Sequence, residues 1–533
     1  MASKMIRDQV LQTIEKHVPK DVAVALSIPE DPKFGHYATN VAFALAKQEG
    51  KSPMAIAERI ASAIKSDVIR EARAAAPGFI NFFLTPEALH EELNAIAKAK
   101  KKYGASKARK GEKIQVEFVS ANPTGPLTLA NGRGGFLGDV LANILQAAGA
   151  SVEREYYVND TGNQIFTLGK SLLAGLNRST VAQGPENENL YQGEYISEWA
   201  AKHKTDVKKL RADPAKLGER AAKDFLKLIQ RALEKEAHIK FDRYTSEKNI
   251  HAKGYAKKAL AVFKKKKAVY EKDGGVWLKT TAEGDDKDRV LITKSGFPTY
   301  FLADAGHYLE TKMRGFKAKI NILGPDHYGY VARIQAAAKL VGLPSSRVLI
   351  TQAVRLLRGG QEVKMSKRKG NFVTFEEVVE EVGADAARFF FLSVAPESHM
   401  DFNLDLAKER SNKNPVYYAQ YAYVRAKAVV VKAKNIKGKP NLSLLNTPAD
   451  AALLFALSRF PEVLSDAASD YAVHRLTQYT STLARTFHNF YEREHVVGEA
   501  PALAAARLAL VKGSIIVFEN LFRILGISAP SKM

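Results

Sequence analysis

The sequence predicts an α/β protein in which a doubly wound parallel sheet is preceded by a small α/β domain and followed by an all-helical domain. Three observations predict this organisation. Strand, helix and strand patterns alternate from residue 114 to 158, the first hundred residues mix helices with a strand, and the pattern after Asn412 is almost purely helical. A chain of 533 residues is long enough for roughly three to four domains.

The N-terminal hundred residues are expected to form the first domain. Helical patterns cover residues 8–16, 38–49 and 54–66, and Ser52-Pro53 is a start signal for the third helix. Residues 78–84 predict a strand. A basic segment with few apolar residues, 97–113, is expected to end the domain as a linker.

The central region begins with a strand at 114–119, a helix at 132–148 with one apolar face, and a strand at 152–158. Ligands of such sheets bind at the carboxyl ends of the strands, where the loop from Ser120 to Asn131 is expected to lie. Further strands are predicted at 289–293, 320–323 and 348–351. A lysine-rich insertion, about 156–287 and helical from 194 to 237, separates the two halves.

Composition restricts the functional class. The net charge is +23 and the pI is about 9.6. A protein this basic is expected to have an acidic partner, most commonly nucleic acid; the alternative explanation of the charge is an adaptation for solubility. The absence of cysteine excludes disulfides and thiolate metal sites. The N-terminal segment lacks the apolar stretch of a signal peptide, and no apolar run approaches about 20 residues, so we expect a cytoplasmic protein without a membrane span.

Two segments far apart in the chain carry the strongest functional signal. Residues 364–368 read Lys-Met-Ser-Lys-Arg, with glycines on either side, and such a loop can close over a polyphosphate. By itself it could be an exposed basic loop that only adds solubility. The upstream segment 120–132, Ser-Ala-Asn-Pro-Thr-Gly-Pro-Leu-Thr-Leu-Ala-Asn-Gly, joins a strand to a helix and favours the functional interpretation.

Over essentially its whole length the sequence resembles the bacterial arginyl-tRNA synthetases, which are class I aminoacyl-tRNA synthetases. The segments that carry the resemblance, in chain order, are 33–40, 116–126, 157–160, 284–289, 326–330, 364–367 and 414–418. The resemblance implies an N-terminal α/β domain at 1–100 that contacts the tRNA corner. It also implies a Rossmann-type catalytic domain at 111–410, with the insertion at about 156–287, and an anticodon-binding helical bundle at 411–533.

The resemblance further implies the reaction. Arginine attacks the α-phosphate of ATP, which carries Mg²⁺ as part of the substrate, and a tRNA ribose hydroxyl then attacks the arginyl-adenylate. Lys364 and Lys367 would stabilise the leaving pyrophosphate, and Ser366 would add a hydroxyl contact. No metal bound by the protein itself is expected, and the protein is expected to be a monomer.

A guanidinium is planar and always charged, so its recognition needs carboxylates. Asp304 and Tyr300 are four residues apart and would share a helix face, at positions that hold the guanidinium in the family. Glu117 matches a further acidic position, while Ser120 and Asn122 match positions near the amino and carboxylate ends of arginine. The alternatives are a partly exposed strand residue for Glu117 and a core aromatic for Tyr300. Lysine is the competing substrate that these acids leave open.

For ATP, the resemblance points to Gly324, Asp326 and His327, although an Asp-His pair is often only a turn or a helix cap. The helix near Gly132 would direct its amides at phosphate. The family motif His-x-Gly-His is replaced by Thr128-Leu129-Ala130-Asn131, in which Thr128 and Asn131 keep hydrogen-bond donors.

Ala130 stands where the family has a glycine, and its methyl group takes room beside the nucleotide. We therefore hypothesise that Ala130 weakens ATP binding. The change also leaves an alternative function open, a catalytically silent or weakened paralogue that binds tRNA.

Contacts with tRNA are expected at both ends of the chain. Aromatic and cationic side chains suit unstacked RNA bases and phosphates. The candidates are Tyr417, Gln420, Tyr421, Arg425 and Tyr491 in the bundle, with Phe34 and Asn40 in the first domain. Alternatively, about half of the tyrosines pack the bundle core, with Tyr417, Tyr421 and Val424 as an inward stripe, and Phe34 and Asn40 only pack their own domain.

Overall fold

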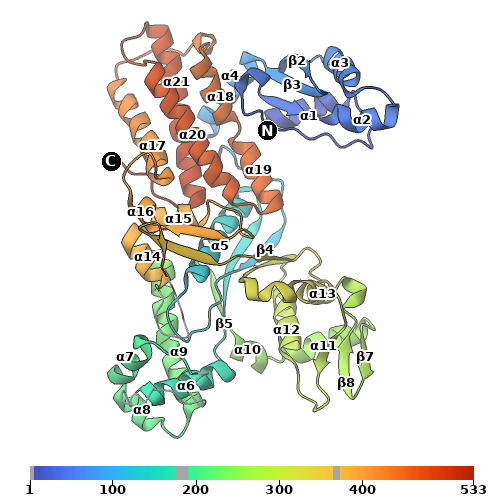
Figure 1. Ribbon diagram of the computed structural model, residues 1–533, viewed down its shortest axis with the longest axis vertical. Helices are drawn as coiled ribbons and strands as arrows, with labels where there is room; N and C mark the ends of the chain where they lie inside the picture. Colours follow the sequence, from blue (N-terminus) through green and yellow to red (C-terminus); the bar gives the residue numbers. More distant parts are fainter. Residues whose placement is uncertain (1–4, 176–189, 364–372) are drawn as a thin grey trace.

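A five-stranded parallel sheet forms the centre of the computed structural model, which describes residues 5–175, 190–363 and 373–533 (Figure 1). Its order is β11-β10-β4-β5-β6. The strands are β4 (Lys113–Glu117), β5 (Ser151–Val158), β6 (Arg243–Ser246), β10 (Ala318–Leu323) and β11 (Arg347–Ile350). The chain runs outward from β4 to β6 and then returns to the other side at β10, so a crevice is expected between the carboxyl ends of β4 and β10. The predicted doubly wound sheet is confirmed.

Two strand assignments from the sequence are wrong. β6 pairs with β5 inside the parallel sheet, although its residues were assigned to the insertion. The strand β9 (Arg289–Ile292) was assigned to this sheet but lies in a separate antiparallel sheet with β7 (Val269–Lys272) and β8 (Gly275–Leu278). Both strands have four residues, and periodicity over such a length does not identify the pairing partner.

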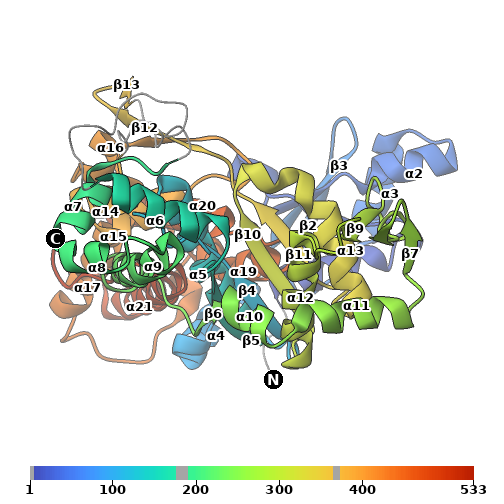
Figure 2. The ribbon, with the colours of Figure 1, turned by 90° about the horizontal axis from the view of Figure 1, so that it is seen from below.

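Two groups of helices lie on opposite sides of the sheet's lower half, and Figure 2 separates them from below. One group contains α6 (Asn163–Gly175), α7 (Glu194–Lys202), α8 (Lys204–Lys209) and α9 (Pro214–Arg231). The other contains α10 (Glu247–Ala252), α11 (Tyr255–Lys265), α12 (Tyr300–Met313) and α13 (Val331–Val341). Each group has an apolar core of its own, so each can hold its side of the crevice as a unit.

The N-terminal unit is the expected small α/β domain. Its antiparallel sheet has the order β1 (Tyr37–Thr39), β3 (Phe79–Leu84), β2 (Ile69–Ala75), and its helices are α1 (Ile6–Glu15), α2 (Val41–Glu49), α3 (Pro53–Ala63) and α4 (Pro86–Ala99). Ser52 caps α3 as predicted. The helix expected from residue 38 begins only at Val41, because the buried residues before it pair with β3. The expected linker shares its first residues with α4, which the sequence did not predict.

Between the sheet and the C-terminal bundle lies a connecting region. It contains β12 (Val354–Arg358), β13 (Gln361–Glu362), β14 (Met400–Asn403), α14 (Phe375–Val382), α15 (Ala384–Phe391) and α16 (Leu404–Lys408). Arg388 of α15 is 1% exposed and donates to Asp139 of α5 (Leu129–Ala147) at 2.6 Å and to the Leu525 carbonyl at 3.4 Å. This side chain therefore joins the bundle to the first helix of the sheet domain.

The C-terminal part is helical, as predicted. Its helices are α17 (Pro415–Lys432), α18 (Pro448–Ser458), α19 (Phe460–Asp470), α20 (His474–Arg493) and α21 (Pro501–Leu525). In the described part of the chain α21 is the one helix long and apolar enough to cross a membrane by composition, but it is a largely buried helix of this bundle. The N-terminal unit packs on the bundle through Tyr37, which donates to Glu462 at 2.5 Å, and Arg7, which is 2.6 Å from Asp466.

Candidate active site

The loop after β4 reaches the crevice in a strained conformation. Val119 and Ser120 have φ angles of 66° and 40°, a region that side chains with a Cβ rarely adopt. The loop is held by two contacts to β5: Tyr156 donates its hydroxyl to the Ala121 carbonyl at 2.7 Å, and the Tyr157 amide donates to Ser120 Oγ at 3.0 Å. Backbone strain that the surroundings enforce is often found at functional sites.

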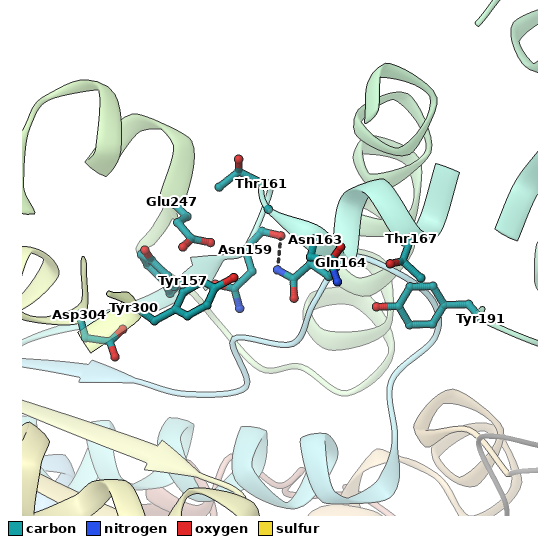
Figure 3. A pocket seen from close by; sticks show the side chains of 11 residues that line it. Tyr157, Asn159, Thr161, Asn163, Gln164, Thr167, Tyr191, Glu247, Tyr300 and Asp304 are labelled. Carbon is teal, nitrogen blue, oxygen red and sulfur yellow. Dashed lines mark hydrogen bonds between the residues drawn. The ribbon is translucent and has the colours of Figure 1, made fainter. Parts of the chain in front are cut away.

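Two adjoining cavities open at this edge of the sheet, with volumes of about 730 and 720 Å³. Both are lined by Tyr157, Asn159, Gln164, Tyr191 and Asp304, so they share a wall. Figure 3 shows the first cavity between α12, the end of β5 and α6. The loop from Glu117 to Asn131 and the residues after β10 line the second.

The first cavity carries carboxyl groups suited to a cation. Tyr300 and Asp304 both line it from α12, as the four-residue spacing predicts, and Glu247 faces them from the start of α10 (Figure 3). The pKa of Asp304 is raised to about 7, mainly by burial and also by the nearby acids Glu117 and Glu247, while His307 and Lys319 act in the opposite direction. Burial also raises the pKa of Glu247. A cationic ligand would stabilise the ionised form of both acids.

Glu117 ends β4 and is 6% exposed, yet it lines the second cavity. Its Oε2 atom accepts from Lys319 Nζ at 2.7 Å and from Asn321 Nδ2 at 2.9 Å, and its Oε1 accepts from the Ser120 hydroxyl at 3.2 Å. Within the described ranges, Glu117, Glu155 and His307 have potential metal-ligand atoms within 4.8 Å of one another. The ammonium of Lys319 bonds to both carboxylates, so it supplies the cation that this group of acids requires.

Thr128 and Asn131 bind each other in a capping box at the start of α5. The Thr128 hydroxyl donates to Asn131 Oδ1 at 2.7 Å and accepts from the Asn131 amide at 3.3 Å. Thr128 and Asn131 were expected to offer hydrogen-bond donors, and in this structure the Thr128 hydroxyl donates within the box. Asn131 lines the second cavity together with Ala130, and its Nδ2 group is the side-chain donor that the capping box does not use.

Gly132 does not face the cavity. Its amide donates to the Thr128 carbonyl at 3.1 Å, inside the helix, and a Cβ here would lie 2.0 Å from the ring of Phe375. The helix begins at Leu129 rather than Gly132, so the assignment of Gly132 to phosphate binding does not fit its position. Its role is to allow close packing of α5 against α14.

The other predicted side chains are distributed as follows. Ser120, Asn122, Gly324, Asp326 and His327 line the second cavity, where Asn122 accepts from Asn159 Nδ2 at 2.8 Å. Asp326 is 80% exposed at its side chain and lies 3.5 Å from His327. Lys364, Ser366 and Lys367 lie outside the described residues.

A separate aromatic and cationic group lies on the bundle, between α17 and α20. Tyr417 stacks on Tyr421 with ring centroids 6.2 Å apart. Arg425 lies over the rings of Tyr421 at 4.4 Å and Tyr491 at 4.8 Å. We call these four side chains the α17–α20 aromatic group. Tyr491 is 37% exposed, so the group reaches solvent.

Two interpretations of this region are corrected. Gln420 is 8% exposed and its amide donates to Asp385 and to Ser528, so it is turned away from an RNA partner. The inward stripe is also wrong, because the buried face of α17 carries Val416, Ala419, Gln420, Ala422, Tyr423 and Ala426. In the first domain Phe34, which is 45% exposed, and Asn40 both lie at the surface, and Lys33 lies over the Phe34 ring at 4.9 Å.

Sequence reasoning missed several residues of the site. Asn159, just after β5, and Gln164, in the first turn of α6, line both cavities, and Glu247 follows β6 directly. A position directly after a parallel strand indicates a ligand-binding residue. The sequence allowed this prediction for Asn159, but not for Glu247, because β6 was not recognised as a strand of the sheet. Buried Lys319 and His307 carry no such signal, because a charged residue inside a strand or helix is usually read as exposed.

Comparison with known proteins places three family models along the chain. They are the arginyl tRNA synthetase N terminal domain at residues 4–84, the catalytic domain of class I (R) tRNA synthetases at 92–391, and the DALR anticodon binding domain at 419–533. The catalytic model alone covers more than half of the chain.

Whole-chain relatives agree with these models. The chain is 41% identical to an arginine–tRNA ligase of Citrifermentans bemidjiense, covering 96% of this chain and 95% of the relative. It is 39% identical to the arginine–tRNA ligase of Heliobacterium modesticaldum, with 96% and 94% covered. The Thermus thermophilus arginyl-tRNA synthetase has the same fold, with a TM-score of 0.78 at 23% identity over 99% of both chains.

Proposed function

The chain belongs to the class I arginyl-tRNA synthetases, and from this membership we propose how its own residues join arginine to tRNA. The protein ligates arginine to its tRNA through an arginyl-adenylate made from ATP, and it releases pyrophosphate and AMP. We infer that it acts in the cytoplasm as a monomer. The division at residues 1–100, 111–410 and 411–533, for tRNA-corner contact, catalysis and anticodon reading, is part of this proposal.

Arginine occupies the first cavity, with its guanidinium against Asp304 and Tyr300. The observation that carries this assignment is the position of Asp304 at both cavities: it lines the first together with Glu247 and Asn159, and the second together with the loop that begins at Glu117. Two acids with raised pKa values, Asp304 and Glu247, line one polar cavity and favour a ligand that carries a permanent positive charge. Glu117, Ser120 and Asn122 then meet the amino and carboxylate ends, next to the second cavity.

Mg-ATP occupies the second cavity as substrate. Gly324, Asp326 and His327 meet the nucleotide from the end of β10, and Asn131 Nδ2 donates from the start of α5 while Ala130 lies beside it. Adenylate formation requires the α-phosphate to lie near the arginine carboxylate, and the five lining residues that the two adjoining cavities share support that geometry. Lys364, Ser366 and Lys367 stabilise the departing pyrophosphate.

The tRNA contacts two distant surfaces. We assign anticodon bases to the α17–α20 aromatic group, because stacked rings with a guanidinium above them suit unstacked bases and a phosphate. We assign the tRNA corner to the surface around Phe34 and Asn40. The net charge of +23 supports a polyanionic partner.

The assignment of the amino-acid cavity is tested with Asp304→Asn and Glu117→Gln. Each variant removes a charge and changes the side-chain shape little, so the KM for arginine should rise by at least about tenfold while the KM for ATP stays within about twofold. Asp470→Asn, an exposed acid paired with Arg475 on the bundle, is the matched control and should change neither constant. Unchanged arginine constants in both site variants would remove the assignment.

The alternative of a silent tRNA-binding paralogue rests on the missing histidines. The capping box of Thr128 and Asn131 keeps the start of α5 ordered without them. No observation on the described residues favours the alternative.

A further inference from the structure

Lys319 is the most deeply buried cation of the site. It lies in the middle of β10 and is 0% exposed. Its ammonium is 2.7 Å from Glu117 Oε2, 2.9 Å from Glu155 Oε2 and 2.8 Å from Gln115 Oε1, so three acceptors match its three protons. The His307 ring, stacked on Tyr157 at 4.2 Å, closes the group with Nε2 at 3.1 Å from the ammonium.

The two carboxylates depend on Lys319 to different degrees. Glu155 also accepts from the Thr245 hydroxyl and lies 3.2 Å from His307 Nε2, 3.8 Å from Arg243 and 3.9 Å from Arg314. Glu117 has the neutral donors Asn321 and Ser120, and its nearest other titratable nitrogen is His307 Nδ1 at 3.8 Å. Among the described residues Lys319 is therefore the single permanent cation within bonding distance of Glu117.

Filling the core does not require a charge at this position. A methionine has a similar length and would occupy the same space without the desolvation penalty of an ammonium. The ammonium of Lys319 binds Oε2 of Glu117. The other carboxylate oxygen, Oε1, accepts from the Ser120 hydroxyl, and both Glu117 and Ser120 line the second cavity. An anchor on one oxygen fixes the direction in which the other one points.

We propose that Lys319 is a positioning residue of the amino-acid site, which holds Glu117 so that its second carboxylate oxygen meets a cationic group of the substrate. The proposal rests on the assignment of Glu117 to arginine binding given above. Lys319 acts through Glu117 and touches neither substrate itself.

The test is Lys319→Met in the full-length protein, with arginine and a non-hydrolysable ATP analogue titrated separately by calorimetry. Loss of the anchor should raise the Kd for arginine about tenfold and leave the Kd for the ATP analogue within about twofold. In steady-state charging the KM for arginine should rise by the same factor, with kcat at saturating arginine nearly unchanged. Arg507→Met is the matched control, because it removes a cation that is 5% exposed and bonded to Glu494, far along the chain in the bundle.

Three results would overturn the proposal. One is an arginine Kd within twofold of the parent in folded Lys319→Met. The second is an equal rise in both Kd values, which is the pattern of general damage. The third is an unchanged arginine Kd in Glu117→Gln, which would also remove the assignment of Glu117 to arginine binding. If the arginine Kd rises in Glu117→Gln but not in Lys319→Met, only the role of Lys319 is removed.

Lys319→Met leaves two buried acids with less compensation and could fail to fold. The double variant Lys319→Met/Glu155→Gln removes one charge of each sign, so its thermal stability should return toward that of the parent. The arginine Kd should stay raised about tenfold in the double variant, because Glu117 still lacks its anchor. Recovery of both stability and arginine affinity would show that Lys319 only balances charge, against the proposal.

Discussion

At the scale of single residues, the proposed contact of Asp304 with the guanidinium predicts that arginine binding depends on pH. The pKa of Asp304 is about 7 in the free protein because the carboxyl is buried near other acids, and a bound guanidinium stabilises the ionised form. The fraction of the free protein in which Asp304 is ionised, the form that binds arginine, therefore falls from about nine-tenths at pH 8 to about one-tenth at pH 6. This predicts that the Kd for arginine is about tenfold higher at pH 6 than at pH 8.

Calorimetry at several pH values, in buffers with different ionisation enthalpies, measures this effect directly. Arginine binding near pH 7 should release a proton to the buffer, and Asp304→Asn should abolish both the release and the pH dependence. A flat Kd between pH 6 and pH 8 in the parent protein would contradict the prediction.

Ala130 makes a second prediction at this scale. Ala130 is the second residue of α5 and lines the second cavity, which we assign to ATP, at a position where the family motif has glycine. Ala130→Gly should lower the KM for ATP several-fold, by about 1 kcal/mol of binding, because the nucleotide can then approach the backbone. The KM for arginine serves as the internal control, and an unchanged KM for ATP would discard the hypothesis.

At the scale of elements, long and strongly patterned segments could be predicted from the sequence. The strand-helix-strand unit from β4 to β5, the bundle helices and the shared face of Tyr300 and Asp304 were all predicted. The partner of β6 was not, since a four-residue strand in a lysine-rich segment has no periodicity to distinguish it. Glu247 could therefore not be predicted as a site residue, because only its position directly after a parallel strand indicates that role.

Side-chain partners were the least predictable feature. Nothing in the local sequence indicates that Gln420 turns inward to Asp385, or that the Thr128 hydroxyl is used by Asn131. Both contacts depend on the three-dimensional neighbourhood, which spacing along one element does not determine. The buried network of Lys319 likewise joins four separate elements, β4, β5, β10 and α12.

The pairing of α17 with α20 carries a prediction for RNA binding. Arg425 lies over two rings and donates to His488 Nδ1 at 3.2 Å, while burial lowers the pKa of His488 and keeps that ring neutral. Arg425→Ala should weaken arginine tRNA binding about tenfold and reduce the salt dependence by about one phosphate contact.

Filter binding at several salt concentrations gives both quantities. The control is Arg475→Ala, an exposed arginine on α20 that is bound to Asp470. If the two variants bind tRNA with the same affinity, the α17–α20 aromatic group is not the anticodon surface.

At the scale of the whole molecule, the contact between the N-terminal unit and the bundle should respond to pH. Burial raises the pKa of Glu462 to about 7, although Tyr37 donates to it. Its ordinary pKa is about 4.3, so the folded state holds a proton that the unfolded chain releases, and the stability falls as pH rises from about 4.3 to 7.

Glu462→Gln removes this titration and keeps an oxygen that can accept from Tyr37. The difference in melting temperature, variant minus parent, should be larger at pH 8 than at pH 5. Thermal unfolding at the two pH values measures the difference, and a variant effect equal at both values would show that Glu462 does not titrate in this window.

This chain charges tRNA with arginine although its nucleotide motif reads Thr128-Leu129-Ala130-Asn131. The most direct measurement is aminoacylation of bacterial arginine tRNA with labelled arginine and Mg-ATP, with lysine as the control amino acid. We predict charging with arginine, none with lysine, and a large loss in Asp304→Asn. Absence of arginine charging, together with tight and salt-sensitive tRNA binding, would instead identify a silent tRNA-binding protein.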